Sequence, residues 1–125
     1  MKTRCLIVDD EPLAIEAIRM HVDKLDSLKL VADCTDAIQA FDILRNSRID
    51  LIFLDIQMPE MDGYEATRQI RKIDKDVIII AQTAFGFLGD RQKAIDSGCN
   101  DYISKPINHE NLSVLIRKYF VSRQG

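Results

Sequence analysis

A chain of 125 residues, of which 46% are hydrophobic and 30% charged, has the size and composition of one globular domain with a single core. Its formal net charge of −3 lacks the basic excess of a nucleic-acid-binding domain, so we expect no direct contact with nucleic acid. The longest apolar run covers only residues 77–81, against roughly 20 for a membrane-spanning helix, and the N-terminal apolar stretch is too short for a secretory signal, so we expect a cytoplasmic domain away from membranes.

The chain alternates between two kinds of segment. Short runs rich in Ile, Val and Leu end in polar or turn residues, which is typical of buried strands. Other segments carry apolar residues at helical spacing, which is typical of amphipathic helices. In chain order, the predicted strands are 5–8, 28–32, 51–54, 77–81 and 102–103, and the helical residues are Ala14, Ile18, Val22 and Leu25, then Ala37, Ala40, Phe41 and Leu44, then Ala66 and Ile70, and finally Leu112, Leu115, Ile116, Tyr119 and Phe120.

The starts of three helices carry local signals. Pro12 suits a first helical turn, and Asp36 and Asn108 are predicted N-caps. Because the strands are apolar on both faces and alternate with helices about five times, the sequence predicts an α/β fold, a doubly wound parallel sheet between helices. In such sheets the functional crevice lies at the carboxyl ends of the strands, where the strand order reverses.

Polar residues follow most of the predicted strands. Three close carboxylates repel one another unless their pKa values rise or a cation binds, and oxygen-only ligands favour Mg²⁺ over a transition metal. Because these strand ends share one edge, the sequence predicts a magnesium site there. The residues at the strand ends are Asp9 and Asp10, then Asp55, then Gln82 and Thr83, and then Ser104, Lys105 and Pro106.

Asp55 differs from the other carboxylates in its surroundings. It follows the apolar run 51–54 and precedes the loop sequence IQMPEMDG, so we expect it at a central, exposed strand tip. A carboxylate there can act as a nucleophile toward phosphorus and form an aspartyl phosphate. Lys105 and the Thr83 hydroxyl supply the contacts that the remaining phosphoryl oxygens need.

These residues resemble a known family, the response regulator receiver domains of two-component and phosphorelay systems, including the chemotaxis receivers. The likeness covers essentially the whole chain and implies one receiver domain at 1–125 with no output domain in this chain. It also implies a flavodoxin-like, five-stranded parallel sheet of order 2-1-3-4-5. The motifs that carry it are Asp9-Asp10, Asp55 within LIFLDIQMPEMDG, Thr83-Ala84, and Lys105-Pro106 within DYISKP.

The resemblance implies roles for the phosphoacceptor and the metal ligands. Asp55 would accept a phosphoryl group from the phosphohistidine of a sensor histidine kinase or a histidine phosphotransfer protein. Asp10, Asp55 and the backbone carbonyl of Gln57 would hold Mg²⁺, for which Mn²⁺ can substitute, with Asp9 acting through water or assisting these ligands. The domain would catalyse its own phosphorylation and dephosphorylation without turning over an external substrate.

The resemblance also implies a switch. Thr83, the Ala84 backbone amide and Lys105 would contact the phosphoryl group, and a cis bond before Pro106 would aim the lysine into the site. When Thr83 moves, Tyr102 would rotate inward and change the face of the fourth helix, fifth strand and fifth helix. An output domain or downstream protein would bind that face, and a phosphorylation-dependent homodimer is compatible with it.

Several alternatives remain open from the sequence. A phosphohydrolase would need an acid/base carboxylate where Gln57 stands, and a flavin-binding module would need a phosphate-binding loop where DDEP stands. A phosphorylation-independent interaction module with the same fold is the main alternative. The first half resembles receivers with LytTR-type outputs and the second half those of hybrid histidine kinases, and the chain is either a stand-alone receiver or a piece of a longer protein. Bulky Phe85 leads us to hypothesise a long-lived phosphoryl group.

Overall fold

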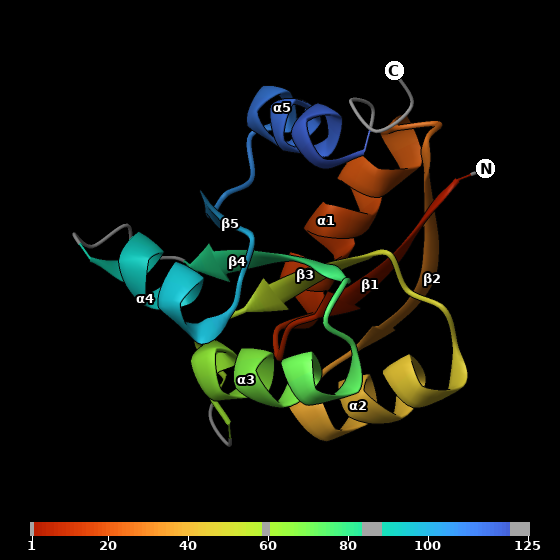
Figure 1. Ribbon diagram of the computed structural model, residues 1–125. Helices are drawn as coiled ribbons and strands as arrows, with labels where there is room; N and C mark the ends of the chain where they lie inside the picture. Colours follow the sequence, from red (N-terminus) through yellow and green to blue (C-terminus); the bar gives the residue numbers. More distant parts are fainter. Residues whose placement is uncertain (1, 59–60, 84–88, 121–125) are drawn as a thin grey trace.

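The computed structural model describes residues 2–58, 61–83 and 89–120. A central sheet is covered on both faces by helices: α1 and α5 lie on one face, and α2, α3 and α4 on the other (Figure 1). This arrangement confirms the predicted α/β fold. The elements are β1 (Thr3–Val8), α1 (Pro12–Lys24), β2 (Leu28–Cys34), α2 (Ala37–Asn46), β3 (Leu51–Asp55), α3 (Gly63–Ile73), β4 (Ile78–Thr83), α4 (Asp90–Ser97), β5 (Asp101–Ser104) and α5 (His109–Tyr119).

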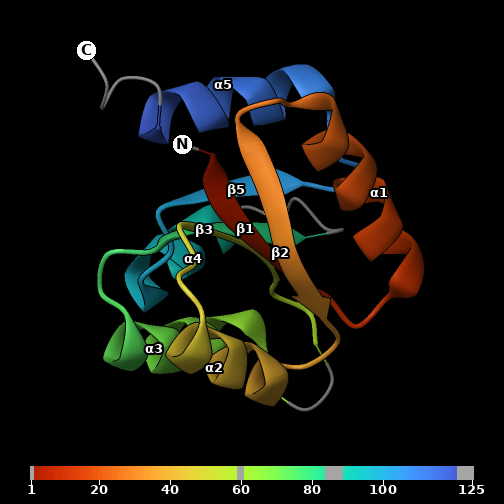
Figure 2. The same ribbon diagram turned by 90° about the vertical axis from the view of Figure 1, so that its right-hand side faces the viewer.

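The sheet has five parallel strands in the order β2-β1-β3-β4-β5, as the family resemblance implied. β1 and β2 are longer than predicted, beginning at Thr3 and ending at Cys34, and β5 begins at Asp101. These added residues join the ladder because strand pairing uses backbone groups and does not require an apolar side chain. Viewed from the side, α2 and α3 run next to each other beneath the sheet (Figure 2).

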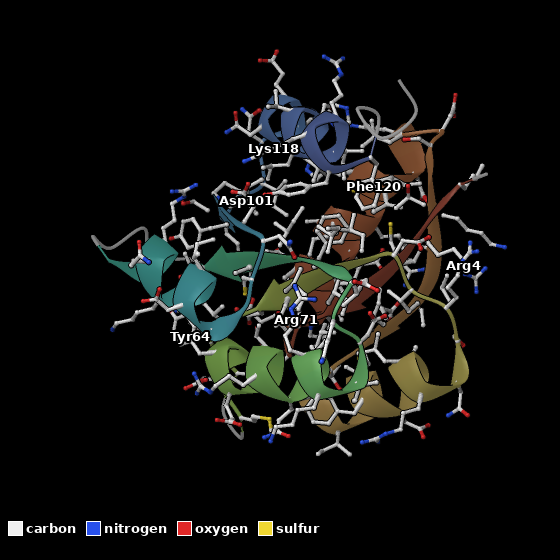
Figure 3. All side chains as sticks on the ribbon, viewed as in Figure 1. Arg4, Tyr64, Arg71, Asp101, Lys118 and Phe120 are labelled. Carbon is white, nitrogen blue, oxygen red and sulfur yellow. The ribbon has the colours of Figure 1, made fainter. Side chains whose placement is uncertain are left out.

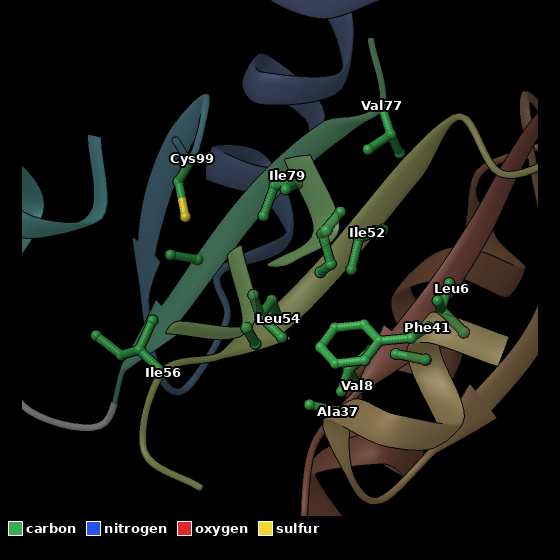
Figure 4. Close-up of a cluster of buried hydrophobic side chains, with 14 of the residues drawn as sticks. Leu6, Val8, Ala37, Phe41, Ile52, Leu54, Ile56, Val77, Ile79 and Cys99 are labelled. Atoms are coloured by element: carbon green, nitrogen blue, oxygen red, sulfur yellow. The ribbon is translucent and has the colours of Figure 1, made fainter. Parts of the chain in front are cut away.

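Two hydrophobic layers hold the helices to the sheet. Successive strand residues point to opposite faces, so Leu54 packs toward α2 and α3 while Phe53 packs toward α1 and α5. Figure 4 shows the first layer, where Phe41 of α2 lies against Val8 and Leu6 of β1. Both layers continue to the last residues of the strands, so the polar residues that follow stand on a packed base.

The three predicted helix starts are confirmed. Pro12 is the first residue of α1, and Asp36 and Asn108 are N-caps whose side chains accept hydrogen bonds from the backbone N–H of the third residue of α2 and of α5, respectively. The three cysteines are free and buried. Within the described ranges, no helix is both long and apolar enough to cross a membrane.

At the amino ends of β4 and β5, Arg71 of α3 joins three segments (Figure 3). Its Nε donates to the Gly98 carbonyl at 2.9 Å, one terminal nitrogen donates to the Val77 carbonyl at 2.6 Å, and the other donates to Asn100 Oδ1 at 2.7 Å. The same Asn100 oxygen accepts from the Ile79 N–H at 2.9 Å. Through these neutral acceptors, Arg71 holds α3 to the segments that precede β4 and β5.

Candidate functional site

The carboxyl edge of the sheet collects the predicted site residues. β1 pairs with β2 on one side and β3 on the other, so the strand order reverses there. Val8 pairs in register with Leu54, which places the residues that follow, Asp9 and Asp55, side by side. Lys105 comes directly after β5 and reaches across to the same place. The site therefore lies at the strand-order reversal, where doubly wound sheets bind ligands.

Asp55 is central, as predicted, but it is not exposed. Only 3% of the residue is accessible, which corrects the prediction of an exposed strand tip. The reason is the chain that follows: Ile56 and Met58 are buried, and the Gln57 N–H donates to Asp55 Oδ1 at 3.0 Å. The first residue of α3, Gly63, also packs so tightly on this turn that a Cβ would lie 2.4 Å from the Ile56 Cα.

Asp9 and Lys105 form the direct ion pair of the site. Lys105 Nζ lies 2.8 Å from Asp9 Oδ2 and 3.8 Å from Asp55 Oδ1. Asp9 is fully buried, and its Oδ1 accepts from the Glu11 N–H at 2.9 Å. Lys105 therefore neutralises Asp9 first, while Asp55 keeps only a longer electrostatic contact with it.

The carboxylates carry more negative charge than Lys105 can balance. Burial, together with the charge of Asp9 and a hydrogen bond with Asp10, raises the pKa of Asp55 to about 6, against the lowering effects of the Gln57 N–H and Lys105. For Lys105, burial works to lower the pKa, but the hydrogen bond to Asp9 and the nearby carboxylates raise it overall. An added cation would relieve this imbalance.

The same carboxylates fit a hard divalent ion. One oxygen each of Asp9, Asp10 and Asp55 lies within 4.8 Å of the other two. The cluster offers only oxygen ligands, without His or Cys, and this donor set suits Mg²⁺ better than a softer transition metal. The residues present therefore match the predicted magnesium site.

The structure also places the other predicted residues. Thr83 is fully buried at the end of β4, and its carbonyl accepts from the Lys105 N–H at 2.7 Å. The Lys105-Pro106 bond is cis, as the resemblance implied. Tyr102 lies half-buried on β5. Ala84 and Phe85, to which the sequence analysis gives roles, lie outside the described residues, so the structure does not test those roles.

A groove of about 510 Å³ runs from Asp55 along α1 to the segment after β5. Its walls include Leu13, Ala17 and Ile107, and Gln82 lies at its base. No sequence signal connects α1 with this site, because the residues of α1 fit an ordinary amphipathic helix. Gln82 carried a weak signal: it continues the alternation of buried β4 residues with a polar side chain.

Two histidines meet at the far end of the groove. His21 of α1 lines it, and His21 Nδ1 lies 3.2 Å from Nδ1 of His109, the first residue of α5. Burial, followed by the charges of His109 and Lys24, lowers the pKa of His21. The two histidines thus form a partly buried pair that joins α1 to α5.

This chain is similar to several known proteins. The family model for the response regulator receiver domain matches residues 5–117. Hybrid signal transduction histidine kinase L of Dictyostelium discoideum is 36% identical over 122 residues, covering 93% of this chain and 7% of that protein. Response regulator MprA of Mycobacterium sp. (strain KMS) is 34% identical over 118 residues, covering 94% of this chain and 50% of that protein. The chain thus spans half or less of these two relatives.

Solved structures show the same likeness. The receiver domain of sensor histidine kinase PA1611 from Pseudomonas aeruginosa PAO1, with magnesium coordinated in its active-site cleft, is 32% identical with a TM-score of 0.83, covering 95% of this chain and 98% of that one. The receiver domain of Saccharomyces cerevisiae Ssk1, in complex with the phosphotransfer protein Ypd1, has a TM-score of 0.86 at 31% identity, covering 98% of this chain and 91% of that one.

Proposed function

This chain belongs to the response regulator receiver domain family of two-component signalling systems, and from this premise we propose that Asp55 accepts a phosphoryl group from a phosphohistidine. The single observation that carries the proposal is the cluster of Asp9, Asp10 and Asp55 around Lys105 at the strand-order reversal. Family membership supplies the reaction class, and this cluster supplies the nucleophile and the countercharges that the reaction needs.

In the proposed reaction, a carboxylate oxygen of Asp55 attacks the phosphorus of the phosphohistidine in line with the P–N bond. The new O–P bond forms as the P–N bond breaks, and the imidazole leaves with the electron pair and takes up a proton. Lys105 places its ammonium charge beside the incoming phosphoryl oxygens. When bound by Asp9, Asp10, Asp55 and the Gln57 carbonyl, Mg²⁺ would neutralise charge on the phosphoryl oxygens, and Mn²⁺ is the expected substitute.

Signal output follows from the new charge. A phosphoryl group brings close to two negative charges and three acceptor oxygens, so it draws the Thr83 hydroxyl and the Lys105 ammonium toward it. Tyr102 then moves into the space beside Thr83 and alters the face of α4, β5 and α5, where Val114 is 60% exposed. That face is the proposed contact for an output domain, a downstream protein or a second phosphorylated copy.

The groove beside Asp55 is the proposed docking place of the phosphodonor. Leu13 on its rim is 82% exposed, and Ala17 and Pro106 add a small apolar surface next to the carboxylates. A helix of a sensor kinase or a phosphotransfer protein that carries the phosphohistidine would bury this surface while presenting phosphorus to Asp55. Because such kinases draw on cytoplasmic ATP, the proposal also places the domain in the cytoplasm.

Intact mass spectrometry tests the proposal. Incubation with phosphoramidate and Mg²⁺ should add about 80 Da, the mass of one phosphoryl group, to the wild type. Neither the Asp55→Asn variant nor the wild type with EDTA should gain this mass, while Asp42→Asn, an exposed aspartate of α2, should behave as the wild type. Absence of the gain in a folded wild type, together with partner binding that survives Asp55→Asn, would instead establish a phosphorylation-independent interaction module.

A further inference from the structure

The side chain of Gln82 is buried beside the site without a hydrogen-bond partner. The residue has 0% exposure, and within the described part of the chain neither its Nε2 nor its Oε1 has a partner. Buried amides are nearly always paired, because leaving both the donor and the acceptor unpaired away from water destabilises the fold. The preceding residue on the same face, Ile80, is apolar and fully buried. An apolar residue at position 82 would likewise avoid the free-energy cost of an unpaired amide.

The position of Gln82 relates it to the phosphoacceptor. It pairs in register with Asp55 on the neighbouring strand, and its carbonyl accepts from the Ile56 N–H at 3.0 Å. Strand alternation points both side chains to the α1 and α5 face, and both line the groove together with Lys105. The unpaired amide is therefore a neighbour of the two residues that the proposed reaction uses most.

Lys105 can donate more hydrogen bonds than the one its ammonium makes within the described part of the chain. Its ammonium has three N–H donors, of which one is directed to Asp9 at 2.8 Å, while Asp55 lies at 3.8 Å. A phosphoryl group on Asp55 would draw the ammonium away from Asp9 and toward Gln82, whose strand is the neighbour of β3. A neutral amide oxygen there can accept an N–H without adding a charge to a site that already holds three carboxylates.

We propose that Gln82 is a positioning residue of the phosphorylated state: its Oε1 accepts a hydrogen bond from the Lys105 ammonium once Asp55 carries a phosphoryl group. This inference rests on the proposed phosphoacceptor function. The amide is unpaired before phosphorylation and paired after it, so Gln82 destabilises the first state relative to the second. Its presence therefore shifts the equilibrium of the domain toward the phosphorylated conformation.

Gln82→Met tests this inference, because methionine keeps the length of the side chain and removes the amide. Two quantities are measured: the urea unfolding midpoint of the free protein, and the affinity for beryllofluoride with Mg²⁺, a phosphoryl mimic. We expect the midpoint to rise and the affinity to fall about tenfold, the loss expected for one hydrogen bond to a charged group. Gln39→Met, at an exposed glutamine of α2, is the matched control and should change neither quantity.

A double-mutant cycle shows whether Gln82 acts through Lys105. In a Lys105→Met background, Gln82→Met should leave the beryllofluoride affinity unchanged. An affinity equal to that of the wild type in Gln82→Met, or a fall in affinity that persists in the Lys105→Met background, overturns the inference. So does a lower midpoint together with weaker binding, which would indicate a structural role; Gln82→Leu repeats the measurement if the first variant does not fold. A wild type that binds no beryllofluoride contradicts the phosphoacceptor function itself.

Discussion

The two ends of the central sheet differ in how their buried charges are balanced. At the amino ends of β4 and β5, the guanidinium of Arg71 meets neutral oxygens, and each of its three nitrogens donates a hydrogen bond. At the carboxyl ends, among the residues that the structure describes, the ammonium of Lys105 faces three carboxylates, and the Gln82 amide has no partner. The hydrogen bonds at the amino ends stabilise the fold. At the carboxyl ends a cation would relieve the excess of negative charge, and the Gln82 amide would gain a partner in the proposed phosphorylated state.

Arg71→Met is the substitution with the largest expected effect on stability. It removes all five hydrogen bonds that the guanidinium donates and leaves the Gly98 and Val77 carbonyls without this charged partner. We expect the free energy of unfolding to fall by about 3 kcal/mol in urea titrations. Phosphorylation of the folded fraction should be unchanged, because the site lies at the other end of the strands.

Arg68→Met is the matched control for that change. Arg68 lies on the same helix, and its exposed side chain pairs with Glu65 at 3.0 Å. Since exposed ion pairs contribute little, we expect a loss of less than about 0.5 kcal/mol. Equal losses in the two variants would contradict the view that the network around Arg71 stabilises the amino ends of β4 and β5.

Asp55→Asn should raise the free energy of unfolding, whereas Arg71→Met lowers it. In the absence of divalent cations, the variant removes a buried charge that Lys105 does not fully balance, so we expect unfolding at pH 7.5 to cost about 1–2 kcal/mol more than in the wild type. Urea titrations of both proteins in EDTA measure the difference. Added Mg²⁺ should stabilise the wild type and reduce the gap.

The pH dependence of that gap follows from the raised pKa of Asp55. Its pKa rises from 3.8 to about 6 on folding, so the folded state holds the proton more tightly than the unfolded chain. The stability gained in this way is fully present below pH 3.8 and is lost as the pH rises through about 6. The advantage of Asp55→Asn should therefore shrink between pH 7.5 and pH 4; an advantage independent of pH would rule out this electrostatic cause.

Much of the fold and the site was predictable because the signals are local. Apolar runs gave the five strands, and the polar residues after them, such as Asp9 and Asp55, gave the site, since parallel strands end at one edge. The family resemblance added the strand order. The contacts of Arg71 were not predictable, because its partner Gly98 lies 27 positions away and only the packing of α3 against α4 brings them together.

The burial of Asp55 and the state of Gln82 were unpredictable for a related reason. Both depend on how the loop after β3, the helix α1 and the segment after β5 close over the strand ends, which alternation within one strand does not specify. The candidate site residues could thus be predicted from the sequence, but their protonation and pairing depend on these tertiary contacts.

The smallest expected effect concerns Asp101, which lies buried at the amino end of β5. Burial works to raise its pKa, but hydrogen bonds from the Tyr119 hydroxyl, the Tyr102 N–H and Lys118 lower it overall. The folded carboxylate therefore holds its proton less tightly than the unfolded one. Its stabilising contribution is present above the unfolded pKa of 3.8 and is lost as the pH falls through the lower folded value, the reverse of Asp55.

Tyr119→Phe measures this contribution. The hydroxyl lies 2.7 Å from Asp101 Oδ2 and 2.8 Å from the Asn100 carbonyl, so its removal takes one hydrogen bond from the amino end of the sheet. We expect a loss of about 1 kcal/mol at pH 7 that becomes smaller below pH 4, as Asp101 is protonated in the wild type too. Lys118→Met, which removes an exposed partner of the same carboxylate, should cost less. If the loss in Tyr119→Phe stays constant down to pH 3, the hydroxyl donates mainly to the Asn100 carbonyl and not to Asp101. Tyr119 would then contribute nothing to the difference in pH response between the two ends of the sheet.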